Sequence, residues 1–99
     1  MSFIQILEFT TDRVDDVETL MDTWVAQSQG RRRVDRALLA ADRDDPKTYV
    51  QIVEFPSYTD AMENSALPET TEFAAKLAEL CDGTVRFRNL DLQRSDHLA

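Results

Sequence analysis

Cysteine is nearly absent from this sequence, since Cys81 is the only one among 99 residues. A single cysteine excludes an intramolecular disulfide and fits a protein of the reducing cytoplasm. Cys81 lies in an apolar helical stripe, and the sequence around it offers no base that would activate a thiol. We therefore expect a small buried thiol rather than a nucleophile.

Glycine and histidine are also scarce, with two glycines and one histidine. Two glycines cannot build a glycine-rich phosphate loop. One histidine and one cysteine cannot supply a zinc site. A Ser/His/Asp triad would depend on His97, close to the end of the sequence, so no metal site or triad is expected.

The sequence also lacks long hydrophobic runs and an excess of basic residues. Without an apolar stretch of about 18 residues or a basic leader, neither a membrane span nor a signal peptide is expected. The 19 acidic and 11 basic residues give a net charge of −8, which repels nucleic acid. The one basic cluster, at 31–33, is interpreted as the solvated entrance to a strand.

The remaining composition is that of a globular domain, with 42% hydrophobic and 30% charged residues. A chain of this length forms one domain, placed at 1–93, with a polar tail at 94–99. Because a domain of this size buries only about two-thirds of its unfolded surface, self-association would add stability.

Hydrophobic periodicity alternates between strand and helix spacing along the chain. The predicted elements are a strand at 3–9, a helix from 12 to 30, strands at 33–41 and 48–55, a short turn at 58–65, a helix at 69–81 and a strand at 84–93. In the last strand the apolar positions change parity between Phe87 and Leu90, which predicts a β-bulge there.

The second and third predicted strands are expected to form a hairpin around the polar loop 42–46. If Asp42 pairs with Thr48, then Arg36 faces Glu54 across the two strands. Two interpretations stay open for this pair. It stabilises the hairpin as a cross-strand ion pair, or it forms the charged floor of a ligand cavity.

The order strand, helix, strand, strand, helix, strand predicts a ferredoxin-like βαββαβ fold of the α+β class. Right-handed crossovers place the helices on one face of a four-stranded antiparallel sheet. The strands carry apolar residues on both faces, so the open face is expected to pair with a second copy of the chain.

The segment YVQIVEFPSYTDAMENSALPETTEFAAKL resembles the antibiotic biosynthesis monooxygenase superfamily, whose members are dimeric α/β barrels. The features that carry the resemblance are the acidic loop 42–46, a strand ending in Glu54-Phe55, a helix starting at Ser57 and a break at Pro68. The resemblance implies a homodimer built through the sheet face.

The superfamily includes oxygenases that act on phenolic or quinol-like substrates without metal or flavin, so the resemblance implies no cofactor. It also includes haem-degrading enzymes, which hold iron through a His in the second helix and carry a Trp in the broken helix. Here the only His is His97, and Asn64 is the nearest match to that Trp. Both departures argue against haem.

The resemblance implies five site residues. Asn64 and Tyr58 would contact the substrate oxygen and Arg86 would stabilise developing negative charge, while Tyr49 and Trp24 would bind the substrate. Each has a structural alternative. Tyr58 would lie on the surface, Asn64 would satisfy backbone groups near the break, Arg86 would pair with Glu8, and Trp24 would pack in the core.

Two functions follow as hypotheses. The first is a cofactor-independent monooxygenase acting on a small aromatic or quinol-like metabolite. The second is a non-catalytic dimeric domain that binds a small molecule or assists another protein. An open cavity between sheet and helices, lined by Tyr, Asn and Arg, favours the enzyme. A space filled by Trp24, Phe73 and Leu77 favours the second function.

Overall fold

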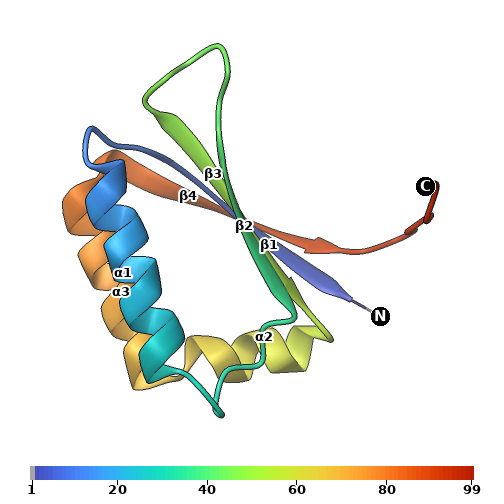
Figure 1. The fold of residues 1–99 in the computed structure, drawn as a ribbon. Coiled ribbons are helices and arrows are strands. Elements are labelled where there is room, and N and C mark those ends of the chain that lie inside the picture. The colour runs from blue at the N-terminus through green and yellow to red at the C-terminus, as the bar shows by residue number, and fades with distance from the viewer. Residues whose placement is uncertain (1) are drawn as a thin grey trace.

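The computed structural model describes residues 2–99 and shows one sheet with helices beside it (Figure 1). Within these residues the elements are β1 (Phe3–Thr10), α1 (Val14–Gln27), β2 (Arg36–Ala41), β3 (Thr48–Phe55), α2 (Tyr58–Ser65), α3 (Pro68–Leu80) and β4 (Asp82–Asp91). Helices α1 and α3 lie side by side on one side of the sheet, and α2 follows at an angle to them.

The sheet has the strand order β2-β3-β1-β4, and every neighbouring pair is antiparallel. Strands β1 and β2 are connected through α1 and are separated in the sheet by β3. The second crossover, from β3 to β4, runs through α2 and α3. This arrangement confirms the predicted ferredoxin-like α+β fold, with four antiparallel strands among the described residues.

The predicted hairpin register is confirmed. Arg36 pairs with Glu54 across β2 and β3, and the Nε and Nη2 of Arg36 donate to Glu54 Oε2 at 2.9 and 2.7 Å. The predicted position of the bulge is wrong. The register between β1 and β4 is regular from Phe87 to Asp91 and shifts instead between Glu8 and Thr10.

The two faces of the sheet differ in burial. Successive strand residues point to opposite faces, and on β1 the residues Phe3, Leu7 and Phe9 are buried beneath the helices. Ile4 and Ile6 point to the other face and are only partly buried. The helices therefore cover one face, and the apolar residues of the other face have no cover from the chain's own described elements.

Local features determine where α2 and α3 begin. Ser57 caps α2, since its Oγ accepts from the backbone N–H of Asp60 at 3.1 Å and donates to Asp60 Oδ2 at 2.8 Å. Pro68 begins α3, where its fixed φ suits the first helical turn and its missing N–H is not needed. The segment 58–65, predicted as a short turn, is an α-helix of eight residues, and Asn64 lies at its end, beside the break.

Cys81 closes α3 and is partly buried. Burial raises the pKa of its thiol, which keeps the group protonated and unreactive. Beyond Asp91, the described residues form no further helix or strand. Within residues 2–99, each helix is too short or too polar to cross a bilayer.

Candidate functional site

A cavity of about 480 Å³ lies between the helices and the helix-facing side of the sheet. Its volume is within the range of small-molecule sites, about 300–1,000 Å³. The lining combines apolar and neutral polar side chains: Gln5, Leu7, Met21, Trp24, Val25, Val34, Ala37, Gln51, Val53, Phe55, Asn64, Ser65, Thr70, Thr71, Phe73, Ala74 and Phe87. The space between sheet and helices is therefore open rather than filled.

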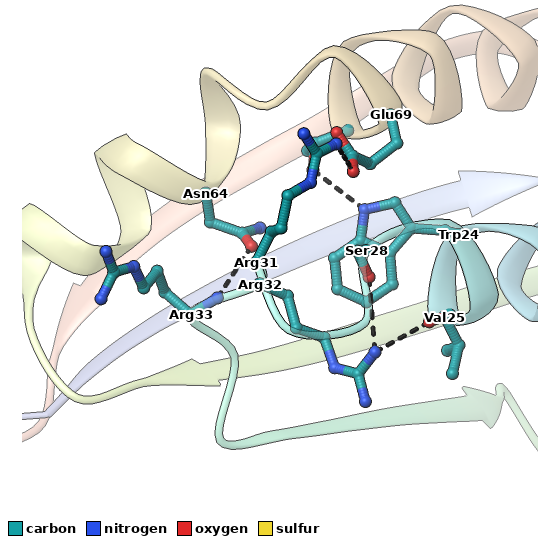
Figure 2. Close-up of polar contacts among 9 residues, drawn as sticks. Trp24, Val25, Ser28, Arg31, Arg32, Arg33, Asn64 and Glu69 are labelled. Atoms are coloured by element: carbon teal, nitrogen blue, oxygen red, sulfur yellow. Dashed lines mark hydrogen bonds and ion pairs between the residues drawn. The ribbon is translucent and has the colours of Figure 1, made fainter.

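Asn64 contributes a polar group to this cavity from the end of α2, where it is only 4% exposed. Its Oδ1 accepts a hydrogen bond from the backbone N–H of Arg33 at 3.2 Å (Figure 2). That bond fixes the orientation of the side-chain amide. Because the oxygen is occupied, the NH2 group of Asn64 is the part available to a ligand as a donor.

Trp24 forms a wall of the cavity from α1. Its indole N–H donates to Thr70 Oγ1 on α3 at 2.9 Å, so the polar atom of the ring is already used. The guanidinium of Arg32 lies 5.9 Å from the ring centroid, within reach of a cation–π contact. The indole ring is therefore held from two sides and presents apolar surface to the cavity.

The basic cluster at 31–33 binds the helices together instead of being only a solvated strand entrance. Arg31 forms an ion pair with Glu69 on α3, and Arg33 pairs with Glu63 on α2 at 3.5 Å. Arg32 donates to the carbonyl of Val25 on α1 at 2.8 Å. Figure 2 shows the three arginines reaching toward different helices from one loop. This loop ties α1, α2 and α3 together beside Trp24 and Asn64.

Glu69 is a buried carboxylate in the first turn of α3, and its side chain is 5% exposed. The hydrogen bond from Arg31, helped by the backbone N–H of Glu69 itself, lowers the pKa of this carboxyl. Within residues 2–99 its second oxygen, Oε1, has no hydrogen-bond partner. The Arg31 contact is thus what stabilises the charged form.

The lowered pKa of Glu69 makes a prediction about acid stability. Glu69 of the unfolded chain takes up its proton around the ordinary pKa of 4.5, whereas the folded protein does so only at lower pH. The stability from the Arg31–Glu69 pair is therefore lost as pH falls through the folded pKa. We expect Glu69→Gln to destabilise the protein at neutral pH and the difference from wild type to shrink at acid pH. Urea unfolding across this range measures it.

The matched control for that prediction is Glu72→Gln. Glu72 lies one turn further along α3, is 58% exposed and pairs with Lys76 on the surface. Exposed pairs of this kind contribute little, so this variant should unfold almost like wild type at every pH. A Glu69→Gln deficit that stays equal at neutral and acid pH would contradict the role given to the pair.

The structure brings together two of the five predicted site residues, Asn64 and Trp24. Tyr58 is 57% exposed and packs edge-on against Phe3, with ring centroids 5.3 Å apart. Tyr49 stacks on Phe9 at 6.0 Å. Neither tyrosine contributes to the cavity lining among the described residues.

Arg86 lies on the opposite face of the sheet from the cavity. It pairs with Glu8 across β1 and β4, and its Nη1 is 3.7 Å from Glu8 Oε2. The neighbouring Phe87 points to the helix side and lines the cavity. Arg86 therefore pairs with Glu8, which was its structural alternative. The Arg36–Glu54 pair also lies on the open face, so it is a cross-strand ion pair and does not form the floor of the cavity.

Gln51 is a cavity residue that the sequence prediction missed. It lies on the helix side of β3, paired with Leu7 on β1 and Leu39 on β2, and is 8% exposed. Its Oε1 has no hydrogen-bond partner within residues 2–99. The sequence could have indicated this residue. Gln51 shares a strand face with Tyr49 and Val53, and a polar residue on a face that is expected to be buried and apolar is unusual.

Metal ligands are not grouped at this site. In the part of the chain that the structure describes, no three residues among His, Cys, Asp and Glu lie together in a way that could hold a metal ion.

Comparisons with known proteins find the same fold. No family model matches the chain, and no curated protein matches its sequence. Among solved structures, Rv0793 from Mycobacterium tuberculosis is similar with a TM-score of 0.80 at 16% identity, over 98% of this chain and 100% of that chain. SnoaB, a cofactor-independent oxygenase from Streptomyces nogalater, is similar with a TM-score of 0.79 at 18% identity, over 95% of each chain.

A protein named antibiotic biosynthesis monooxygenase is similar with a TM-score of 0.74 at 18% identity, over 95% of this chain and 100% of that chain. At these identities the similarity concerns the fold. The chain therefore has the monooxygenase-like fold that its resemblance to the antibiotic biosynthesis monooxygenase superfamily implied.

Proposed function

We propose that this chain binds a small aromatic or quinol-like molecule in the cavity and oxidises it with dioxygen, as a cofactor-independent monooxygenase. The observation that carries the proposal is Asn64, a buried donor whose orientation is fixed at the wall of a largely apolar cavity. The fold shared with SnoaB, a cofactor-independent oxygenase, supports it.

The chemistry needs a substrate that can become electron-rich. A CH2 group conjugated to a carbonyl through an aromatic ring loses a proton to water, and the resulting enolate oxygen accepts a hydrogen bond from Asn64 Nδ2. With most water displaced by the bound substrate, such a donor stabilises the anion strongly. The enolate then passes electrons to dioxygen. Overall, two C–H bonds break and one C=O bond forms, while the second oxygen atom leaves as water.

The neutral lining limits which substrates can react. Among the described residues, every side chain that lines the cavity is uncharged at neutral pH. The proposed site therefore stabilises negative charge by hydrogen bonding and leaves acidity to the substrate itself. Phenols and enolisable aromatic ketones meet this requirement, whereas unactivated hydrocarbons do not.

Asn64→Ala tests the proposal through oxygen uptake with 1,8-dihydroxyanthrone, a fused aromatic ketone with an acidic CH2 group. Removing a donor of this kind lowers turnover by about 10²–10³-fold, and we expect a loss of that size. Circular dichroism must show that the variant is folded, because it also loses the bond to Arg33. Met62→Ala, on the exposed side of α2, is the control and should keep wild-type turnover.

Two outcomes separate the proposed function from its alternative. Wild-type uptake no faster than the uncatalysed rate would overturn the monooxygenase. If the aromatic compound still binds in that case, the chain is a non-catalytic binding domain, which an uncharged cavity also permits.

We also infer that a second copy of the chain covers the open face of the sheet. The register sets three rows on this face that span all four strands. In one outer row, Arg36 pairs with Glu54 at the β2–β3 end. In the other outer row, Glu8 pairs with Arg86 at the β1–β4 end, which is the diagonally opposite corner. Apolar residues lie between these pairs: Ile4, Ile6, Leu38, Ala40, Val50, Ile52 and Leu90. Arg88, which pairs with Ile6, is the exposed β4 end of the central row. An apolar centre with like ion pairs at opposite corners suits a two-fold interface.

A further inference from the structure

We propose that Gln51 is a specificity-determining residue that accepts a hydrogen bond from a hydroxyl group on the aromatic ligand. This inference rests on the binding half of the proposed function, because it names the ligand group that the same cavity selects. It starts from an unusual placement. Gln51 is a polar side chain in the interior of the sheet, flanked by Leu7 and Leu39 on the adjacent strands.

The Oε1 of Gln51 is an acceptor that lacks a donor. It is buried and has no hydrogen-bond partner within residues 2–99, while the side chain contributes to the cavity lining. Buried polar groups in folded proteins are almost always paired with protein or with ordered water. The oxygen itself is buried, so a donor that enters the cavity reaches it once the side-chain amide turns toward the cavity that Gln51 lines.

The other glutamine of the lining shows the contrast. The Nε2 of Gln5, on β1, donates to Asn89 Oδ1 at 3.2 Å across the β1–β4 pair. Gln5 thus has a partner within the fold, whereas the oxygen of Gln51 does not. The last torsion of a glutamine side chain is broad and nearly two-fold, so the amide of Gln51 can turn its oxygen toward a ligand.

Gln51 and Asn64 belong to opposite layers around the cavity. Gln51 projects from β3 in the sheet, and Asn64 lies on α2 in the helix layer. Asn64 offers a donor and Gln51 an acceptor. A ligand that satisfies both has an acceptor oxygen, such as a ring carbonyl or enolate, and a separate hydroxyl. The pair therefore selects hydroxylated aromatic ketones or quinones over unsubstituted or O-methylated ones.

Ligand binding can be measured without catalysis. Trp24 is the only tryptophan of the chain and lines the cavity, so its fluorescence reports occupancy. The probes are 2-hydroxyanthraquinone and 2-methoxyanthraquinone, used at a pH where the hydroxyl is protonated. Both are already oxidised, so quenching reads binding alone and is independent of oxygen uptake.

We expect wild type to bind the hydroxyl compound about tenfold more tightly than its methyl ether, the size expected for one hydrogen bond. Gln51→Met keeps the length of the side chain and removes its polar group, so it should bind both probes equally. Loss of an unpaired buried oxygen should leave the ligand-free variant at least as stable as wild type. Gln93→Met, an exposed position beyond β4, should keep the tenfold preference.

Each of the other possible results contradicts one part of the proposal. Equal binding of both probes to wild type, or a preference that survives in Gln51→Met, overturns the role of Gln51 and leaves the proposed oxygenase standing. A Gln51→Met protein that unfolds more easily than wild type assigns the side chain to structure instead. Absence of quenching by either probe overturns this inference together with ligand binding in the cavity, whatever the oxygen-uptake assay gives.

Discussion

Replacing Leu77 with alanine is expected to lower the free energy of unfolding by about 2–5 kcal/mol. Leu77 lies on the inner face of α3, is 1% exposed and belongs to the cluster that joins the helices to β1 and β3. The substitution removes buried methyl groups and leaves a void that the rigid sheet cannot close. Domains of this size have only about 5–15 kcal/mol of stability, so the loss is a large share.

Urea unfolding followed by far-ultraviolet circular dichroism measures that change. The control is Leu98→Ala, because Leu98 is 91% exposed in the tail beyond β4. Surface substitutions of this kind stay within about 0.5 kcal/mol of wild type. If the two leucine variants unfolded at the same urea concentration, the burial of Leu77 under α3 would be refuted.

The fold was predictable because its signals are local and repeated. The short β-rich apolar runs of β1 and β3, the helical spacing in α1 and the break at Pro68 each identify one element, and their order leaves one common topology. The hairpin register was predictable from the loop that closes it. The backbone N–H of Asp42 donates to the carbonyl of Thr48 at 2.9 Å, and counting along both strands from this pair places Arg36 opposite Glu54.

The bulge was misplaced because one sequence pattern has two physical causes. A change of apolar parity arises from an inserted residue or from apolar residues on both faces of a regular strand. In β4 the second cause applies. Phe87 lines the cavity on the helix side, and Leu90 points to the open face in regular register with Ile4. The observed shift in the β1–β4 register lies closer to Asp82. It leaves the alternation of side chains between the two faces unchanged, so the sequence carries no sign of it.

The site was predictable only where residue type and helix face agreed. Asn64 and Trp24 lie on the inner sides of helices whose periodicity the sequence shows. Arg86 could not be placed, because strand alternation gives two faces without saying which one meets the helices. Gln51 was overlooked because a single glutamine in an apolar strand resembles an edge position, and the burial of β3 follows only from the strand order.

The second large effect concerns the open face of the sheet. Ile52 on β3 and Ile6 on β1 are paired at the centre of this face, where the proposed second copy would bury them. Ile52→Arg places an unpaired charge there, and a two-fold interface contains that charge twice. Burying each unpaired charge costs several kcal/mol, so we expect the dissociation constant to rise by more than about 10³-fold.

Sedimentation equilibrium of the Ile52→Arg variant and wild type tests this expectation. Wild type should sediment with twice the 11.3 kDa chain mass, and the variant should approach the mass of one chain. Thr19→Arg adds the same charge on the exposed side of α1 and should remain dimeric. A wild-type protein that sediments as one chain would refute the pairing. An Ile52→Arg protein that stays dimeric would move the interface away from this face, since an arginine at its centre cannot be buried twice without a partner.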